Sequence, residues 1–138
     1  MALERANPQD DWYPMKFELS QSFYFEAAHT LRRKIETEGS LRIHGHTYHA
    51  EVTISGDPDP STGMTMDLAF LRQEVEKVRQ QLDHRFLDEV AGIGPATLEN
   101  LCSFIHKQLA VSLPNIDRIT VWRPASGDKC CLKRMTSQ

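Results

Sequence analysis

Residues 44–55 read HGHTYHAEVTIS, and the alternation in this stretch decides the fold. Its even positions hold two histidines followed by apolar or aromatic residues: His44, His46, Tyr48, Ala50, Val52 and Ile54. Its odd positions from Thr47 to Ser55 are polar. This pattern predicts a β-strand with one buried face, on which His44 and His46 point the same way. His49 belongs to the polar face, and we expect it to have no metal role.

The segment before it, residues 17–29, alternates in the same manner and ends its apolar face at His29. Residues 31–41 between the two strands have mixed charge and no period, which predicts a loop. Antiparallel pairing of the two strands would bring His29 beside His44 and His46. Their side chains would then lie together at one end of the buried face.

The rest of the chain predicts two helices and a hairpin. Apolar residues three and four apart indicate helices at 67–82 and 97–110, capped by Asp67 and Thr97. Residues 116–123 and 129–134 are predicted strands joined by a turn at 124–128. This order predicts an α+β fold, a four-stranded antiparallel sheet with two helices on one face. Its open edges favour assembly of several copies into a barrel.

The composition is that of a soluble globular domain, with 138 residues, 40% of them hydrophobic and 25% charged. We predict a flexible tail at 1–14, without a secretion signal, and a single domain at 15–138. A formal charge of −3 argues against a nucleic-acid partner, and no apolar run is long enough to span a membrane. Three cysteines, two of them adjacent, imply no disulfide framework and favour a cytoplasmic location.

The three histidines suggest a metal site. Neutral imidazoles that leave a fourth position open are the usual ligands of a catalytic zinc ion. We therefore predict that His29, His44 and His46 bind Zn²⁺. Histidines that are merely satisfied by hydrogen bonds at a strand end are the alternative, and the residues alone leave it open.

Five short motifs follow one another in the chain: FEAAH at 25–29, HGH at 44–46, TGMTMD at 62–67, LDH at 82–84 and TLEN at 97–100. Together they resemble the 6-pyruvoyl-tetrahydropterin and 6-carboxytetrahydropterin synthase family, over about residues 17–132. The resemblance implies the tunnelling fold, in which sheet edges pair into a trimeric barrel and two trimers stack into a homohexamer. It also implies zinc on the three histidines.

The substrate that the resemblance implies is 7,8-dihydroneopterin triphosphate, and the carboxy branch of the family leads to queuosine. Zinc as a Lewis acid stabilises developing alkoxide character, while an acid and a base move protons. The resemblance assigns that proton relay to Asp83 and His84, for which a simple helix end is the alternative. It assigns binding of the heterocycle to Thr97 and Glu99.

The candidate general base departs from the family pattern. The synthases carry a cysteine four residues before HGH, where this chain has Ser40, and a hydroxyl is a far poorer base than a thiolate. Some relatives use a glutamate instead, so Glu36 and Glu38 on the same segment are candidate bases. Solvated surface charges are the alternative for both.

A second departure is Arg123. The family places there a glutamate that binds the guanidine-like edge of the pterin, and arginine cannot accept those hydrogen bonds. Either Glu99 takes over this role, or Arg123 binds an acid group of the ligand. A pairing of Arg123 with a surface carboxylate is the third possibility.

These observations predict a zinc-dependent carbon–oxygen or carbon–carbon lyase, foremost a 6-carboxytetrahydropterin synthase, or else a 6-pyruvoyl-tetrahydropterin synthase. One alternative is a paralog that cleaves the side chain to 6-hydroxymethyldihydropterin, with Glu36 or Glu38 as base. Another is a zinc-containing binding protein without turnover.

Overall fold

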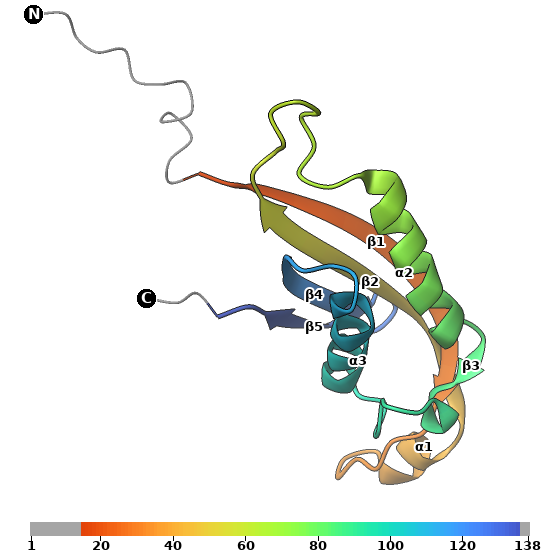
Figure 1. Ribbon diagram of the computed structural model, residues 1–138. Coiled ribbons are helices and arrows are strands. Elements are labelled where there is room, and N and C mark those ends of the chain that lie inside the picture. The colour runs from red at the N-terminus through yellow and green to blue at the C-terminus, as the bar shows by residue number, and fades with distance from the viewer. Residues whose placement is uncertain (1–14, 136–138) are drawn as a thin grey trace, which may run out of the picture.

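Two long antiparallel strands form the centre of the structure, a computed structural model that describes residues 15–135 (Figure 1). Strand β1 (Phe17–His29) and strand β2 (His44–Gly56) pair along their whole length, from Phe17 opposite Gly56 to His29 opposite His44. The antiparallel pairing predicted from the alternation is confirmed. The predicted tail at 1–14 lies outside the described residues.

Three further strands complete the sheet, which has the order β3-β1-β2-β4-β5. Strand β4 (Ile116–Arg123) pairs with β2, and strand β5 (Asp128–Lys133) pairs with β4, both antiparallel. The prediction of a four-stranded, purely antiparallel sheet needs one correction. A short strand β3 (Arg85–Phe86) adds to the edge of β1 in parallel. Two residues are too few to show an alternating pattern.

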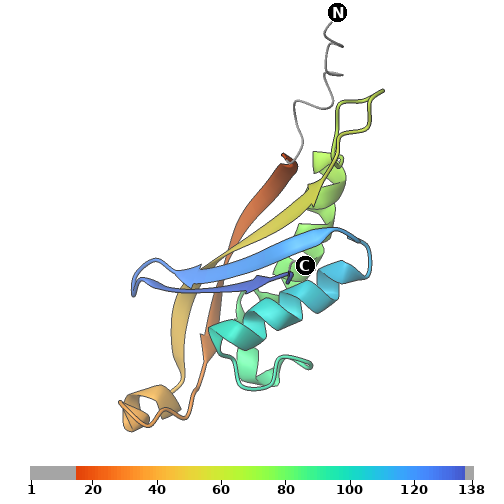
Figure 2. The same cartoon turned by 90° about the vertical axis from the view of Figure 1, so that its left-hand side faces the viewer.

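Two helices cover one face of this sheet and confirm the α+β class (Figures 1 and 2). Helix α2 (Leu68–Leu82) begins at Asp67, whose side chain accepts a hydrogen bond from the backbone N–H of Ala69. Helix α3 (Leu98–Ala110) begins at Thr97, whose hydroxyl accepts from the N–H of Asn100. Their apolar stripes meet the buried sheet face in one continuous core. Cys102 on α3 belongs to it.

The segment between β1 and β2 is more ordered than the predicted loop. It contains a short helix α1 (Thr37–Leu41), and a 3₁₀ helix η2 (Leu87–Glu89) follows β3. Ser40 is buried, donates through Oγ to the carbonyl of Thr37 at 2.8 Å and accepts from the N–H of Arg33 at 3.2 Å. These hydrogen bonds order the segment between β1 and β2, in which the sequence shows no helical or strand period.

The two faces of the sheet differ in character. The face under the helices is apolar until its end, where the histidines lie, whereas the other face carries polar and aromatic side chains such as Tyr24, Glu26 and His49. Between residues 15 and 135, no helix has the length and apolar character that a membrane crossing requires.

Candidate functional site

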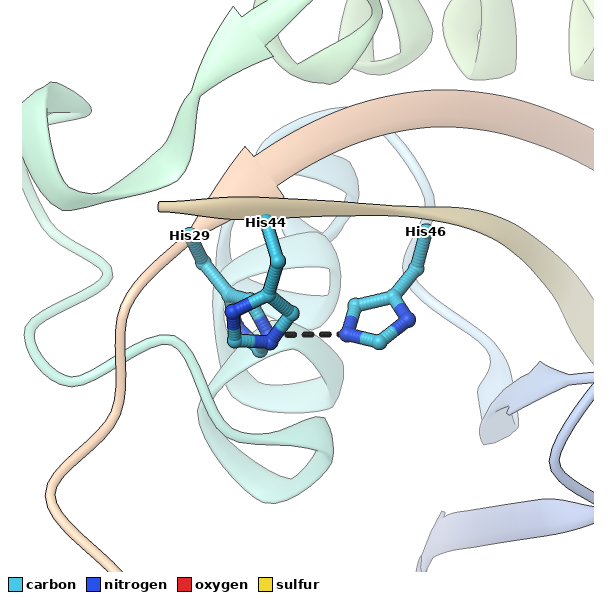
Figure 3. Close-up of side chains that lie close together, drawn as sticks. All are labelled: His29, His44 and His46. Atoms are coloured by element: carbon cyan, nitrogen blue, oxygen red, sulfur yellow. Dashed lines mark hydrogen bonds between the residues drawn. The ribbon is translucent and has the colours of Figure 1, made fainter. Parts of the chain in front are cut away.

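The three predicted metal ligands converge at one end of the helix-covered face (Figure 3). The register sets His29 opposite His44, and the two-residue period of β2 brings His46 to the same side. Nε2 of His29 lies 3.0 Å from Nε2 of His46. One ring nitrogen from each of the three lies within 4.8 Å of the others. The backbone thus delivers three nitrogen donors to one point.

Backbone carbonyls fix the tautomers of two of these rings. Nδ1 of His29 lies 2.9 Å from the carbonyl oxygen of Ala96, and Nδ1 of His44 lies 2.7 Å from that of Arg42. A carbonyl oxygen only accepts, so each Nδ1 carries the proton and donates it. The Nε2 atoms keep their lone pairs, as ligation of a metal requires.

Burial and neighbouring charges keep the rings of His29 and His46 neutral. Burial lowers the pKa of His29 below its ordinary value, and the carbonyl of Ala96 offsets only part of this. Burial also lowers the pKa of His46 to about 4, and the positive charge of Arg123 adds to the shift. Both imidazoles are therefore uncharged at pH 7, which is the form that binds a metal ion.

The histidine set fits a zinc ion. With Zn–N bonds of about 2.0–2.1 Å, neighbouring ligand nitrogens in a tetrahedron lie about 3.3 Å apart. The observed separations, 3.0 Å for one pair and no more than 4.8 Å overall, need only small side-chain adjustments. Within residues 15–135, these three side chains are the one group with metal-ligand spacing. Three protein ligands leave a position for a bound ligand.

Three cavities border the cluster, and the third, of about 520 Å³, is lined by His46 together with Glu26, Thr47 and His84. The first, of about 470 Å³, lies beside His29 and is lined by Tyr48, Thr97, Glu99 and Arg123, among others. The second, of about 330 Å³, lies beside His44 and His46. Its lining includes Arg33, Glu36, Ser40, Arg123 and Asp128. Arg33, Arg123 and Asp128 line both the first and the second cavity. Thr97 and Glu99, the residues predicted to bind a heterocycle, thus share one cavity with His29.

The structure separates the two candidate bases. Glu36 lines the cavity beside His44 and His46, whereas the exposed Glu38 lines none of the three cavities. The hydroxyl of Ser40 lies in the wall of the same cavity, but its hydrogen bonds to the backbone hold it in a structural role. Of these three side chains, Glu36 is the one placed as a free carboxylate near the histidines.

Asp83 and His84 form a pair away from the cluster. Asp83 Oδ2 lies 2.8 Å from His84 Nδ1, and His84 Nε2 lies 4.0 Å from Glu26 Oε2. Glu26 sits opposite Thr47 on the face of the sheet that carries no helix, whereas the three histidines lie on the other face. The pair lines neither the cavity beside His29 nor the one beside His44, but His84 and His46 both line the third cavity. Within a single chain, the relay pair and the predicted metal ligands thus border one cavity, although Glu26, the neighbour of His84, projects from the opposite face of the sheet.

Backbone strain coincides with two of the predicted catalytic residues. In the described part of the chain, the non-glycine residues with left-handed φ are Glu36, at 58°, and His84, at 57°. Such conformations cost about 1–3 kcal/mol at non-glycine positions and cluster at functional sites. Glu36 and His84 thus share a left-handed backbone conformation that the sequence did not predict.

Arg123 is nearly fully buried, with 7% of its surface exposed. Its Nη2 donates to Asp128 Oδ2 at 2.6 Å, and its Nη1 lies 3.3 Å from His46 Nε2. Its Nε is buried without a hydrogen-bond partner. A carboxylate does pair with Arg123, and the guanidinium also reaches the histidine cluster.

Sequence reasoning did not single out three other members of the site. Tyr48 lies two residues beyond His46 on the same face of β2, so the alternation itself could have identified it. Burial raises the pKa of Tyr48 to about 12, so it stays protonated. The carbonyl of Ala96 comes from a loop and the carboxylate of Asp128 from the first residue of β5, and neither carried a comparable signal.

The chain is similar to known proteins of one family over most of its length. The family model described as 6-pyruvoyl tetrahydropterin synthase matches residues 18–134. The 6-pyruvoyl tetrahydrobiopterin synthase of Homo sapiens is 35% identical over 111 residues, covering 70% of this chain and 77% of the relative. The dihydroneopterin monophosphate aldolase of Pyrococcus furiosus is 32% identical over 111 residues, covering 78% and 90%.

Two further similarities concern the carboxy branch and the fold. The 6-carboxy-5,6,7,8-tetrahydropterin synthase of Synechocystis is 31% identical over 108 residues, covering 73% of this chain and 81% of the relative. The solved Caenorhabditis elegans 6-pyruvoyl tetrahydropterin synthase superimposes with a TM-score of 0.76 at 25% identity, covering 87% of this chain and 96% of that one. The chain therefore belongs to the 6-pyruvoyl tetrahydropterin synthase family, whose members are lyases of pterin metabolism.

Proposed function

We propose that this chain is a zinc-dependent lyase that acts on 7,8-dihydroneopterin triphosphate in the manner of a 6-carboxytetrahydropterin synthase. The observation that carries the proposal is the convergence of three imidazole nitrogens beside a cavity lined by Thr97 and Glu99. The similarity to the Synechocystis enzyme supports the carboxy branch, and with it a role in queuosine formation. A 6-pyruvoyl-type reaction on the same substrate differs only in its product.

Each residue of the site has a part in this reaction. Zinc supplies Lewis acidity when it is bound to His29, His44 and His46. The carboxylate of Glu99 accepts hydrogen bonds from the N–H groups of the heterocycle, and the hydroxyl of Thr97 remains able to donate. Glu36, facing the cavity beside His44, accepts the proton that leaves the substrate side chain.

The relay pair acts from a second copy of the chain in this proposal. Asp83 holds the imidazole of His84 through Nδ1, which leaves Nε2 to exchange a proton with the substrate. Since His84 lies next to Glu26, which projects from the sheet face opposite the zinc ligands, the pair meets a substrate bound to another subunit. We propose a cytoplasmic homohexamer of two trimers, with β5 and β3 as the edges available for pairing.

The test combines metal analysis with product analysis. Zinc-loaded protein is incubated with 7,8-dihydroneopterin triphosphate, and the products are identified by mass spectrometry. His44→Ala is expected to lower zinc affinity by more than about 100-fold, since even the loss of a second-shell partner costs 10–100-fold. His49→Ala, on the opposite face, is the control and should keep its metal. Absence of any pterin product from zinc-loaded wild type would refute the proposal.

A matched pair of variants tests the base. Glu36→Gln should reduce kcat by about 10²–10⁴-fold, the usual contribution of a general base. Glu38→Gln makes the same chemical change two residues away, outside the cavities, and should leave kcat within about twofold of wild type. Equal effects of the two substitutions would remove Glu36 from the mechanism.

A second candidate is a side-chain-cleaving aldolase that releases 6-hydroxymethyldihydropterin. It is favoured by the replacement of the family cysteine by Ser40, whose hydroxyl is held by the backbone, and by the free carboxylate of Glu36 in the cavity. The similarity to the Pyrococcus furiosus aldolase supports it as well. The same mass analysis separates the two, because the carboxy and hydroxymethyl products differ in mass.

A further inference from the structure

Arg123 is a cation that its surroundings do not fully satisfy. The side chain is buried, yet its ion-pair partner, Asp128, leaves half of its own side chain exposed. Its Nε–H is buried and has no acceptor. A buried donor without a partner is costly, and natural proteins keep few of them. The guanidinium is therefore held in place with hydrogen-bonding capacity to spare.

The second observation concerns the contact between Arg123 and His46. Nη1 of Arg123 lies 3.3 Å from Nε2 of His46, whose single lone pair also faces His29 and the metal position. That lone pair cannot accept a hydrogen bond and ligate a metal ion at once. If His46 held a metal ion through Nε2, Nη1 would lose this acceptor and could donate to a bound ligand instead. A cationic metal centre next to the guanidinium would favour a negatively charged ligand group.

The third observation is the charge of the cavity itself. Besides Arg123, its lining includes three exposed cations, Arg32, Arg33 and Lys129. Two carboxylates, Glu99 and Asp128, oppose them, and Asp128 is already paired. The lining of this cavity thus holds four cations against two carboxylates, and one of the carboxylates is already paired with Arg123.

We infer that Arg123 is a ligand-binding residue that selects for an oxyanion, a carboxylate or a phosphate, next to His46. The inference deepens the proposed function, on which it rests for the identity of the heterocycle. Arg123 donates through Nη1 to an oxygen of this group, while Asp128 holds the other side of the guanidinium in place. A neutral or donor-bearing group at this position is disfavoured, because arginine has no acceptor atom.

The experiment measures ligand affinity and needs no turnover. Dissociation constants of pterin-6-carboxylate and its neutral counterpart 6-hydroxymethylpterin are measured by ligand fluorescence, and that of inorganic tripolyphosphate by calorimetry. Wild type should bind at least one of the two anions, and should prefer it at least about tenfold over a neutral ligand, as expected for one charge-assisted hydrogen bond. If the affinity for pterin-6-carboxylate depends on Arg123, the group that Arg123 binds is a carboxylate. If the affinity for tripolyphosphate does, the group is a phosphate.

Four variants give the comparison. Arg123→Gln should lose the preference, and Arg123→Lys should keep part of it. Asp128→Asn keeps a hydrogen-bond acceptor beside Arg123 but removes its counter-charge, so anion affinity should rise several-fold. Lys133→Gln removes one positive charge from the same hairpin outside the cavities and is the control. If the Arg123 variants fail to fold, Asp128→Asn still tests the inference. Asp128 is exposed, so its substitution should leave the protein folded.

Two results would overturn the inference: wild type that binds neither anion, or an unchanged preference in folded Arg123→Gln. Conversion of 7,8-dihydroneopterin triphosphate by wild type is followed separately. A protein that turns over this substrate without an Arg123-dependent anion preference would keep its proposed function and lose this specificity residue.

Discussion

Nε2 of His46 has two close neighbours, Nε2 of His29 at 3.0 Å and Nη1 of Arg123 at 3.3 Å. The first is an imidazole nitrogen and the second belongs to a cation. Together with burial, the cation keeps the imidazole neutral. The same surroundings that prepare the ring for a metal thus keep it unprotonated in the folded chain down to about pH 4. This has a measurable effect on stability.

The metal-free protein should become less stable as the pH falls from 6.5 towards 4. His46 has a pKa of about 4 when folded and an ordinary pKa of 6.5 when unfolded. Above pH 6.5 it is neutral in both states, and below that the unfolded state takes up the proton more readily. His46→Gln should flatten this part of the pH profile in urea denaturation, whereas His49→Gln should not. An identical slope in wild type and His46→Gln would contradict the assignment.

For single residues, the sequence predicted the strand face on which a side chain lies better than the contacts that the side chain makes. The alternation of 44–55 and 17–29 identified His29, His44 and His46 on one face, because strand periodicity alone determines facing. The buried state of Arg123 and its reach to His46 depended on the turn at 124–128 and on Asp128. Contacts made by loops follow from no local period.

Among the elements, the β1–β2 pair positions the site most directly. Both strands are long, and their register is unbroken from Phe17 to His29, so the histidines at their ends are held by the whole hairpin. Helix α3 adds the remaining constraint, because the carbonyl of Ala96, just before its cap at Thr97, fixes the ring of His29. The site therefore depends on the start of α3.

The cap of α2, by contrast, should affect stability alone. Asp67→Ala removes the acceptor for the N–H of Ala69 and should lower the free energy of unfolding by about 1 kcal/mol. Asp67→Asn keeps an acceptor and should cost only a few tenths of that. Urea denaturation measures both. Zinc affinity should be unchanged, and a weaker metal site in Asp67→Ala would show that α2 contributes to the site after all.

The elements that the sequence missed are short or irregular. Strand β3 has two residues and helix α1 five, both below the length at which a period becomes visible. Helix α1 is instead organised by the hydroxyl of Ser40 and by the left-handed backbone of Glu36. Long amphipathic elements were predicted nearly to the residue, since burial of one face determines them.

For the molecule as a whole, the two faces of the sheet divide the predicted chemistry. The metal ligands lie on the face under the helices. Asp83, at the end of α2, bonds the edge of β1, and His84 lies next to Glu26, which projects from the uncovered face. We expect the proposed site, which needs both groups, to combine residues of more than one copy. The strand order leaves β3 and β5 as edges through which copies can pair.

Mixing two inactive variants tests this division. His44→Ala lacks a metal ligand and His84→Ala lacks the relay, so neither should turn over substrate alone. After joint unfolding and refolding at equal amounts, about a quarter of wild-type activity should return, because each partner residue is intact in half of the copies. The double variant His44→Ala/His84→Ala mixed with itself is the control. Mixtures that stay inactive would place both functions within one chain.

The position of the proposed metal ligands would also link the thermal stability of this protein to its metal supply. His29 is the last residue of β1 and His44 the first of β2, so a bound ion closes the 30–43 connection at its base. An ion held only by the native state raises the melting temperature with the logarithm of its free concentration. Thermal shift against buffered zinc should therefore rise steadily, so that the melting temperature of this chain serves as a gauge of available zinc.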